Sequence, residues 1–164
     1  MADFLFKGLL QEDSWKENVH VITDSKGIIT SIKENVIGES FQNFAVPGFQ
    51  NAHSHAFQYA MAGLAELHST SQSKNDFWSW RKIMYELALN ISPLQMENIA
   101  TMLYKEMLRN GYTHVAEFHY LHHDLNGGPF NNLSEMGERL ISAAKRAGIK
   151  ITLVPIFYQN GGFG

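Results

Sequence analysis

The sequence contains no cysteine, and no stretch of it approaches the roughly 18 consecutive apolar residues that a membrane-spanning helix needs. Without cysteine the chain has no disulfide framework and no thiolate chemistry, which fits the cytoplasm. The first fifteen residues do not resemble a signal peptide, because Asp3 interrupts a short apolar run and no small-residue cleavage site follows. We therefore expect a cytoplasmic protein without a membrane partner.

The chain also lacks a large excess of either charge, since the formal net charge is −3 and the isoelectric point is about 6.2. A balance this close to neutral gives no reason to expect nucleic acid or an anionic membrane as a partner. Hydrophobic residues make up 45% of the 164 residues, which is typical of a soluble globular protein rather than a disordered or fibrous one. The length suits one domain of average size.

Histidine is the residue type that stands out. The chain has eight histidines, and five of them fall in two tight clusters: His53, His55, His119, His122 and His123. A high histidine count can arise by chance, but clustering is less expected by chance and directs attention to these two segments. The other three, His20, His68 and His114, receive no functional assignment.

The first 45 residues show the alternation of short β-strands. Residues 4–10 are rich in apolar side chains, and residues 19–23 and 28–33 alternate on either side of a turn sequence at 24–27. Residues 34–42 are typical of a polar loop or a short strand. The pattern predicts a β-hairpin within a small all-β region.

From residue 44 onward the sequence predicts alternating strands and helices. Pro47-Gly48 bends the chain into an apolar strand, and an aromatic-rich helix is expected over 76–89. Ser92 can cap the next helix, with Pro93 at its first position and Gln95 completing a capping box. The expected order is strand 44–52, helix 92–110 ended by Gly111, strand 112–118, helix 134–147 ended by Gly148, and strand 149–157.

Strands that alternate with helices indicate parallel βαβ units and an α/β fold. Three strands and two helices leave an open layer with an uncovered edge, whereas a complete (β/α)₈ barrel takes roughly 250 residues. We therefore expect the N-terminal part of a (β/α)₈ metal-dependent hydrolase barrel, cut after its third strand. Residues 46–164 would form the incomplete barrel, and residues 1–45 would supply strands of a small β-sandwich.

The strongest chemical signal is Asn51-Ala52-His53-Ser54-His55, at the end of a predicted strand. Residues two apart on a strand project to the same side, so both imidazoles can be aimed at one metal ion. Barrel enzymes build their sites at the carboxyl ends of strands, where this pair is expected to lie. The pattern predicts that His53 and His55 are metal ligands, with their ring nitrogens within about 5 Å of each other. The alternative is a plain α/β domain with a fortuitous histidine pair.

Several segments also resemble a known family. Residues 47–66, PGFQNAHSHAFQYAMAGLAE, resemble the metal-binding first strand of the amidohydrolase superfamily. Within that superfamily, HSHAFQ, DFWSWRKIMYELA, AEFHYLHHD and the terminal GGFG resemble the formimidoylglutamate deiminases. The resemblance is thin over residues 1–43 and close from residue 44 onward. The first-strand motif is typical of the whole superfamily, and the later segments narrow the resemblance to the deiminases.

The resemblance implies a reaction and further site residues. Enzymes of this family hydrolyse N-formimidoyl-L-glutamate to N-formyl-L-glutamate and ammonia in histidine degradation, with Zn²⁺ or another divalent first-row metal. Gln58 and Tyr120 resemble substrate-binding residues, and Arg81 resembles an arginine that reaches a substrate carboxylate from a neighbouring subunit. A homodimer is therefore implied for the full-length protein. An arginine fork suits a dicarboxylate substrate, because it can donate two parallel hydrogen bonds.

The resemblance also implies what this segment lacks. The superfamily completes its metal site with a histidine on strand five, sometimes another on strand six, and an aspartate after strand eight. These ligands and the catalytic acid and base are expected beyond residue 164, so the chain alone should be inactive. Two rival functions remain open at this point. One is a nucleobase or triazine deaminase of the same superfamily, which needs no arginine clamp, and the other is a metal-binding regulatory homologue without turnover.

Residues near the second histidine cluster admit more than one arrangement. Glu117 and His119 share one face of their predicted strand, and Tyr120 lies on the other face if the strand stays regular. All three can face one pocket only if the strand ends near residue 118. We expect His122 and His123 to be loop residues rather than supports for the metal ligands. The aromatic cluster in residues 77–85 is expected to form core or a subunit contact.

Overall fold

The computed structural model describes residues 1–38, 41–64 and 77–157. The chain divides into two compact units, Met1–Gly48 and Phe49–Gly164, which are considered one at a time. His68 and the terminal GGFG segment lie outside the described residues. Across the described ranges, none of the helices has the length and apolar character required to span a membrane.

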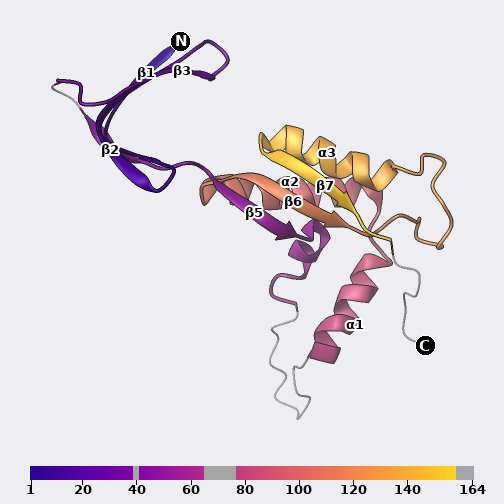
Figure 1. The fold of residues 1–164 in the computed structure, drawn as a ribbon. Helices are drawn as coiled ribbons and strands as arrows, with labels where there is room; N and C mark the ends of the chain where they lie inside the picture. Colours follow the sequence, from indigo (N-terminus) through magenta and orange to yellow (C-terminus); the bar gives the residue numbers. More distant parts are fainter. Residues whose placement is uncertain (39–40, 65–76, 158–164) are drawn as a thin grey trace. The chain divides into compact units, whose positions relative to one another are not determined.

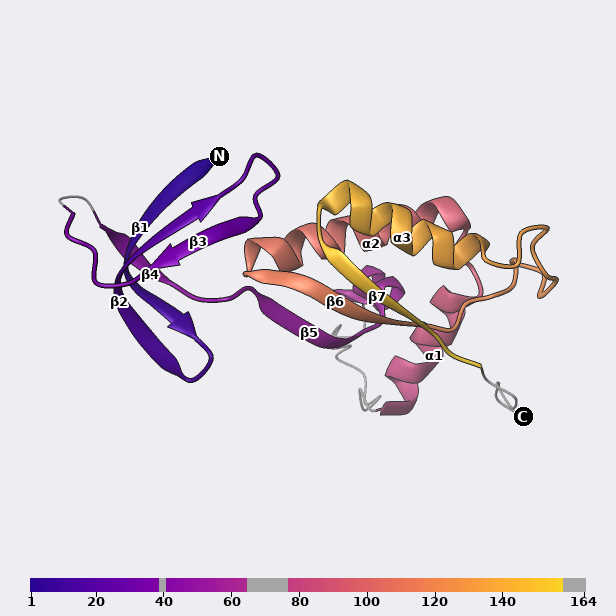
Figure 2. The ribbon, with the colours of Figure 1, turned by 45° about the horizontal axis from the view of Figure 1, so that its top comes forward.

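The first unit is a four-stranded sheet with the spatial order β3-β2-β1-β4 (Figure 2). Its strands are β1 (Ala2–Gln11), β2 (Ser14–Thr23), β3 (Ile29–Lys33) and β4 (Gln42–Ala45). The pairs β1–β2 and β2–β3 are antiparallel, and β4 runs parallel to β1. Val19 and Val21 of β2 are its buried apolar side chains.

The expected hairpin at residues 24–27 is present, between β2 and β3. Asp24 stabilises it by accepting hydrogen bonds at Oδ1 from the backbone N–H groups of Lys26 and Ile28, and Gly27 has a positive φ of 79°. The expected lengths of the first two strands were too short, whereas the third, expected over residues 28–33, begins one residue later, at Ile29. β1 and β2 pair along their whole length around a second turn at Glu12, because cross-strand hydrogen bonding extends a strand beyond its apolar residues.

The second unit is a parallel sheet in the order β5-β6-β7, formed by β5 (Phe49–Ser54), β6 (Tyr112–His119) and β7 (Lys150–Pro155). The helices α2 (Pro93–Arg109) and α3 (Glu135–Ala147) cover one face of it (Figure 1). Between β5 and α2 the chain forms a short 3₁₀ helix, η1 (Ala56–Met61), and then α1 (Phe77–Ala88). This is the parallel βαβ arrangement of a (β/α)₈ barrel, as the sequence predicted.

The residues expected to begin and end the helices of the second unit do so in the structure. The Ser92 hydroxyl accepts a hydrogen bond from the backbone N–H of Gln95, whose side chain in turn accepts one from the Ser92 N–H. Pro93 begins α2, and Asn110 and Gly111 end it. Gly148 ends α3 with a φ of 90°, a left-handed conformation that favours glycine.

The expected strand over residues 44–52 was wrong in its boundaries. Phe44 belongs to β4, where it pairs with Gly8 of the first sheet, and β5 begins only at Phe49. Pro47 lies between the two strands and has no N–H to donate to either ladder. One apolar run therefore serves two different sheets, and β5 extends two residues further than expected, to Ser54.

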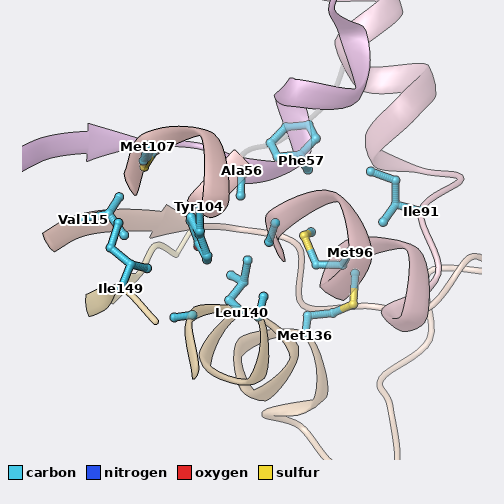
Figure 3. Close-up of a cluster of buried hydrophobic side chains, with 13 residues drawn as sticks. Ala56, Phe57, Ile91, Met96, Tyr104, Met107, Val115, Met136, Leu140 and Ile149 are labelled. Atoms are coloured by element: carbon cyan, nitrogen blue, oxygen red, sulfur yellow. The ribbon is translucent and has the colours of Figure 1, made fainter. Parts of the chain in front are cut away.

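A single apolar core lies between the sheet and its two helices (Figure 3). Met96 and Tyr104 of α2, Leu140 of α3 and Val115 of β6 belong to this core (Figure 3). Each of these four residues is at most 1% exposed. Burial of a side chain of this size contributes about 1.5–3 kcal/mol. Residues 115, 117 and 119 of β6 all point into this helix-covered side, since alternate residues of a strand share a face.

Glu97 of α2 joins the two helices through an ion-pair network. Its Oε1 accepts hydrogen bonds from Arg146 Nη1 and Ser142 Oγ, each at 3.0 Å, and its Oε2 accepts one from Arg139 Nη1 at 3.0 Å. Arg139 also contacts Glu135. The hydrogen bond from Arg139, followed by those from Arg146 and Ser142, lowers the pKa of the Glu97 carboxyl. The charge is thus well paired at the α2–α3 interface.

Candidate metal centre at the carboxyl end of the sheet

His53 and His55 lie at the carboxyl end of β5, and their rings converge. The two Nε2 atoms are 3.0 Å apart, well within the 5 Å expected from the sequence. The regular strand geometry assumed for this pair was only partly correct. His53 is in the strand, whereas His55 has left it and precedes η1 with a φ of −131° and a ψ of 87°. The register with β6 is also irregular between Asn51 and Ser54.

A backbone carbonyl of the neighbouring strand orients the His55 ring. Its Nδ1 lies 2.9 Å from the carbonyl oxygen of Phe118. A carbonyl can only accept, so Nδ1 must carry the proton in this contact, and the neutral ring then has its lone pair on Nε2. This is the arrangement in which a histidine binds a metal through Nε2 while its other nitrogen donates to a carbonyl.

The His53 side of the pair is held by its own strand and by an aromatic ring. The Asn51 side-chain Oδ1 accepts a hydrogen bond from the backbone N–H of His53 at 3.1 Å. The His53 ring lies against Phe118, with ring centroids 4.3 Å apart. Phe118 therefore contributes its carbonyl to one histidine and its ring to the other.

Gln58 and Tyr120, two of the expected substrate-binding residues, meet next to the histidine pair. Gln58 Nε2 donates a hydrogen bond to the Tyr120 hydroxyl at 3.2 Å, and both groups contact Met84 Sδ of α1. The Tyr120 ring is 5.1 Å from the His55 ring, centroid to centroid. β6 ends at His119, so Tyr120 is free of strand alternation and turns toward His55.

Arg81 stands on α1, one helical turn before Met84. Its guanidinium lies over the rings of Trp78 and Tyr85 of the same helix, at 5.8 and 5.4 Å from the ring centroids, and Nη2 is 3.4 Å from the Tyr85 hydroxyl. The contacts of Gln58 and Tyr120 with Met84 bring α1 to the histidine pair, while Arg81 stacks on its own helix.

Glu117 is the residue at this end of the sheet that sequence reasoning left without a role. Its side chain is only 2% exposed, and its Oε1 accepts a hydrogen bond from the backbone N–H of Ala56, the residue after His55. Burial raises the pKa of the Glu117 carboxyl. Its place on the apolar face of β6 was a visible signal, because a carboxylate among buried alternate positions demands a partner.

His119 faces away from the histidine pair. It is 4% exposed and lines a hollow of about 370 Å³ beside α3, together with His122, Gly137 and Leu153. Burial, and to a lesser extent the nearby His122, lowers the pKa of His119 to about 4. His122 Nε2 lies 2.9 Å from the Ile156 carbonyl. His119 and His122 therefore belong to the β6–β7–α3 packing, whereas His123 is exposed and forms a bridge with Pro129; His122 and His123 are loop residues, as expected.

The donor set at the strand end suits a divalent first-row metal. Two ligands that each stand about 2.0–2.1 Å from one zinc ion are themselves roughly 3 Å apart, which matches the separation of the His53 and His55 Nε2 atoms. Within residues 1–38, 41–64 and 77–157, no group of three or more histidine, aspartate or glutamate side chains could hold a metal. The histidine pair could therefore supply only part of a ligand set.

The comparison with family models matches residues 44–157 to the amidohydrolase family. This chain belongs to the amidohydrolase family. The match begins before β5 and extends past β7, so it covers the histidine pair, Gln58, Arg81 and Tyr120.

Two relatives match almost the whole chain. Formimidoylglutamate deiminase of Pseudomonas aeruginosa is 43% identical over 166 residues, which cover 99% of this chain and 36% of that protein. The crystal structure of an amidohydrolase from Brucella melitensis is 47% identical, with a TM-score of 0.88, and covers 100% of this chain and 37% of that one. The chain therefore spans little more than a third of the length of either relative.

A third comparison supports the fold alone. The zinc complex of atrazine chlorohydrolase from Arthrobacter aurescens has a TM-score of 0.67 at 18% identity, and the match covers 94% of this chain and 35% of that one. Zinc is present in that relative. The backbone arrangement of this chain is therefore also found in a protein of low sequence identity.

Proposed function

We propose that this chain supplies the first part of an enzyme that hydrolyses N-formimidoyl-L-glutamate to N-formyl-L-glutamate and ammonia, a step of histidine degradation. The observation that carries the proposal is the convergence of His53 and His55 beside Gln58 and Tyr120. The 43% identity to a formimidoylglutamate deiminase supports the same substrate. A nucleobase or triazine deaminase would share the histidine pair, but no contact of Gln58, Arg81 or Tyr120 favours it.

Under this proposal His53 and His55 hold Zn²⁺ or another divalent first-row metal. Such a metal lowers the pKa of a bound water to about 7, so that hydroxide is available at neutral pH. The remaining ligands and the catalytic acid and base come from parts of the protein outside the described residues. Within the described residues, the His55 Nδ1 contact with the Phe118 carbonyl keeps the Nε2 lone pair available for the metal.

Gln58, Tyr120 and Arg81 act on the substrate rather than on the metal. Gln58 and Tyr120 already form a hydrogen-bonded pair next to His55, and each has polar atoms that can exchange this contact for one with the substrate. Arg81 provides a planar guanidinium for a glutamate carboxylate. In the proposed homodimer it serves the site of the neighbouring subunit, and its stacking on Trp78 and Tyr85 holds the guanidinium in place.

The same proposal extends to the rest of the protein. Residues 1–45 form part of a small β-sandwich, and the sheet of the second unit is continued by the further strands of a closed barrel. The substrate is a small molecule, and the protein works in the cytoplasm, where histidine degradation takes place.

The experiment that tests this function uses the full-length protein that contains this chain. Metal-loaded enzyme is assayed for ammonia release with N-formimidoyl-L-glutamate, guanine, cytosine and a chlorotriazine. The Arg81→Met variant keeps much of the side-chain volume but removes the charged fork. Loss of a charge-assisted hydrogen bond costs roughly 1.5–3 kcal/mol, so kcat/KM for the formimidoyl substrate should fall by about 10- to 150-fold. Metal content should stay unchanged.

Arg109→Met is the matched control, because Arg109 is an exposed arginine at the end of α2 whose partner is Glu106. It should leave kcat/KM unchanged. Preference for guanine, cytosine or the triazine, or an Arg81→Met variant with unaltered kinetics, would overturn the proposed substrate.

A further inference from the structure

The buried Glu117 carboxyl lies directly beneath the segment that carries His55. Ser54 of β5 pairs with Glu117 in the ladder between β5 and β6, and the Glu117 side chain reaches past it to the N–H of Ala56. The next residue of β6, Phe118, binds His55 through its carbonyl. The two residues that flank His55, and His55 itself, are therefore each tied to β6.

The Ala56 amide needs an acceptor from outside its own segment. Ala56 is the first residue of η1, and the first N–H groups of a helix have no carbonyl partner within it. His55 precedes η1, and within the described part of the chain its side chain makes no capping hydrogen bond, because the ring is turned toward Phe118 and His53. Glu117 supplies the missing acceptor through Oε1.

Requirements of packing do not explain a carboxyl group at this position. Among the described residues, Glu117 Oε2 and the Tyr104 hydroxyl make no well-formed hydrogen bond, although the Ser54 and Tyr104 side chains lie near enough to the Glu117 carboxyl to lower its pKa against the larger effect of burial. A buried polar group in that state destabilises a fold, so an apolar side chain of similar size would pack at least as well. What an apolar side chain cannot do is accept the hydrogen bond of Ala56.

We propose that Glu117 is a positioning residue for the metal ligand His55, acting through the Ala56 amide. It fixes the strand-to-helix turn so that His55 Nε2 stays beside His53 Nε2. This inference rests on the proposed metal function, and it adds a residue that supports the ligand without binding metal or substrate. Phe118 O sets the orientation of the ring, and Glu117 sets the backbone from which the ring projects.

The test measures metal affinity rather than activity. Full-length Glu117→Met, stripped of metal, is titrated with Zn²⁺ against a chromophoric chelator, and its Co²⁺ form is compared by visible absorption. Loss of a group that supports a ligand typically weakens metal binding by about 10- to 100-fold, and we expect a rise in Kd of that size together with an altered Co²⁺ spectrum. Glu117→Gln retains an oxygen acceptor for Ala56, so its Zn²⁺ affinity should fall by less than the roughly 10-fold expected when the supporting group is lost.

Glu97→Met is the matched control. Glu97 is also a buried carboxylate of the same sheet-and-helix unit, but it contacts Arg139, Arg146 and Ser142. Its replacement should lower Tm and leave the Zn²⁺ affinity and the Co²⁺ spectrum unchanged. Equal metal affinity in Glu117→Met and wild type, or an equal loss in both Met variants, would refute the positioning role.

A second variant covers the case in which Glu117→Met does not fold. Glu117→Asp keeps a buried acid but withdraws the oxygen from the Ala56 amide by the length of one methylene. It should also weaken Zn²⁺ binding, and wild-type affinity in this variant would count against the inference. His55→Asn separates the two proposals. If His55→Asn binds Zn²⁺ as wild type does, the metal centre itself is wrong, whereas a normal Glu117→Met beside a defective His55→Asn rejects the role of Glu117 alone.

Discussion

Two buried glutamates of the second unit show how differently the same side chain is used. Glu97 lies at the interface of α2 and α3, where both of its oxygens bind cationic or hydroxyl donors. Glu117 lies between β5 and β6, where one oxygen binds the Ala56 amide and the other, within the described residues, makes no well-formed hydrogen bond and has the Tyr104 and Ser54 side chains nearby. The pKa of Glu97 is lowered chiefly by Arg139, and the pKa of Glu117 is raised chiefly by burial.

The difference indicates that Glu97 serves mainly the stability of the helix contact, whereas Glu117 serves mainly the local backbone geometry at the strand end. At the α2–α3 interface both oxygens of Glu97 are paired, as expected of a contact that holds two helices together. The Glu117 carboxyl of β6 has one oxygen that makes no well-formed hydrogen bond among the described residues. Incomplete satisfaction of buried polar groups is characteristic of sites in which local geometry matters more than stability.

The largest expected effect comes from removing a histidine of the strand end. His55→Asn in the full-length enzyme should lose metal, because loss of a mere support of a ligand already costs about 10- to 100-fold in affinity. We expect metal affinity and activity to fall by more than about 100-fold, measured by metal analysis and ammonia release. His20→Asn is the control, since His20 pairs with Asp3 in the first sheet, and it should retain both properties.

The helix interface should respond in the opposite way. Glu97→Met leaves Arg139 and Arg146 without their shared carboxylate, so Tm should fall by several degrees while the metal content stays normal. Glu106→Gln removes an exposed ion pair with Arg109 and should change Tm little, because exposed pairs contribute about 0–1 kcal/mol. A normal Tm for Glu97→Met in thermal unfolding would break the comparison between the two glutamates.

Because His119 is buried on the helix-covered face of the sheet, we expect the stability of the protein to depend on pH. Its pKa is lowered to about 4 by burial and by His122, against about 6.5 in an unfolded chain. The unfolded state therefore binds the proton first as the pH falls. The stabilising contribution is fully present above about pH 6.5 and disappears near pH 4, a loss on the order of 3 kcal/mol.

The measurement is the free energy of unfolding in denaturant at intervals from pH 7 to pH 4, for wild type and His119→Phe. The variant keeps a planar ring and should lose less stability over this range. Parallel curves for the two proteins would show that His119 does not titrate as its burial implies.

The smallest expected effect is a difference in stability between alanine variants of two serines that precede helices. Ser92→Ala removes the acceptor for the Gln95 N–H at the start of α2 and should destabilise the protein by about 1 kcal/mol. Ser134 precedes α3, but among the described residues its side chain makes no capping hydrogen bond, so Ser134→Ala should be nearly neutral. Equal changes in the denaturation midpoints of the two variants would contradict this assignment of the caps.

Local signals in the sequence accounted for much of the fold. The Ser92 capping box, Pro93, Gly148 and the Asp24 turn each depend on residues at most four positions apart, and all appear where expected. The division of residues 44–52 between β4 and β5 was not predictable in this way. It depends on the pairing of Phe44 with Gly8, which no periodicity within the segment reveals.

The candidate site shows the same contrast between short-range features, which were predictable, and long-range contacts, which were not. The spacing of His53 and His55, at the end of an apolar segment, was sufficient to predict that their rings converge. The partners that orient them were not predictable, because Phe118 and Glu117 lie 63 and 61 residues from the groups they bind. The sequence by itself determined the caps, the turns and the histidine pair, since these follow from short-range backbone chemistry. Only the tertiary structure decided the register of β6 against β5, with its irregularity between Asn51 and Ser54, and therefore which carbonyl and which buried carboxyl support the pair.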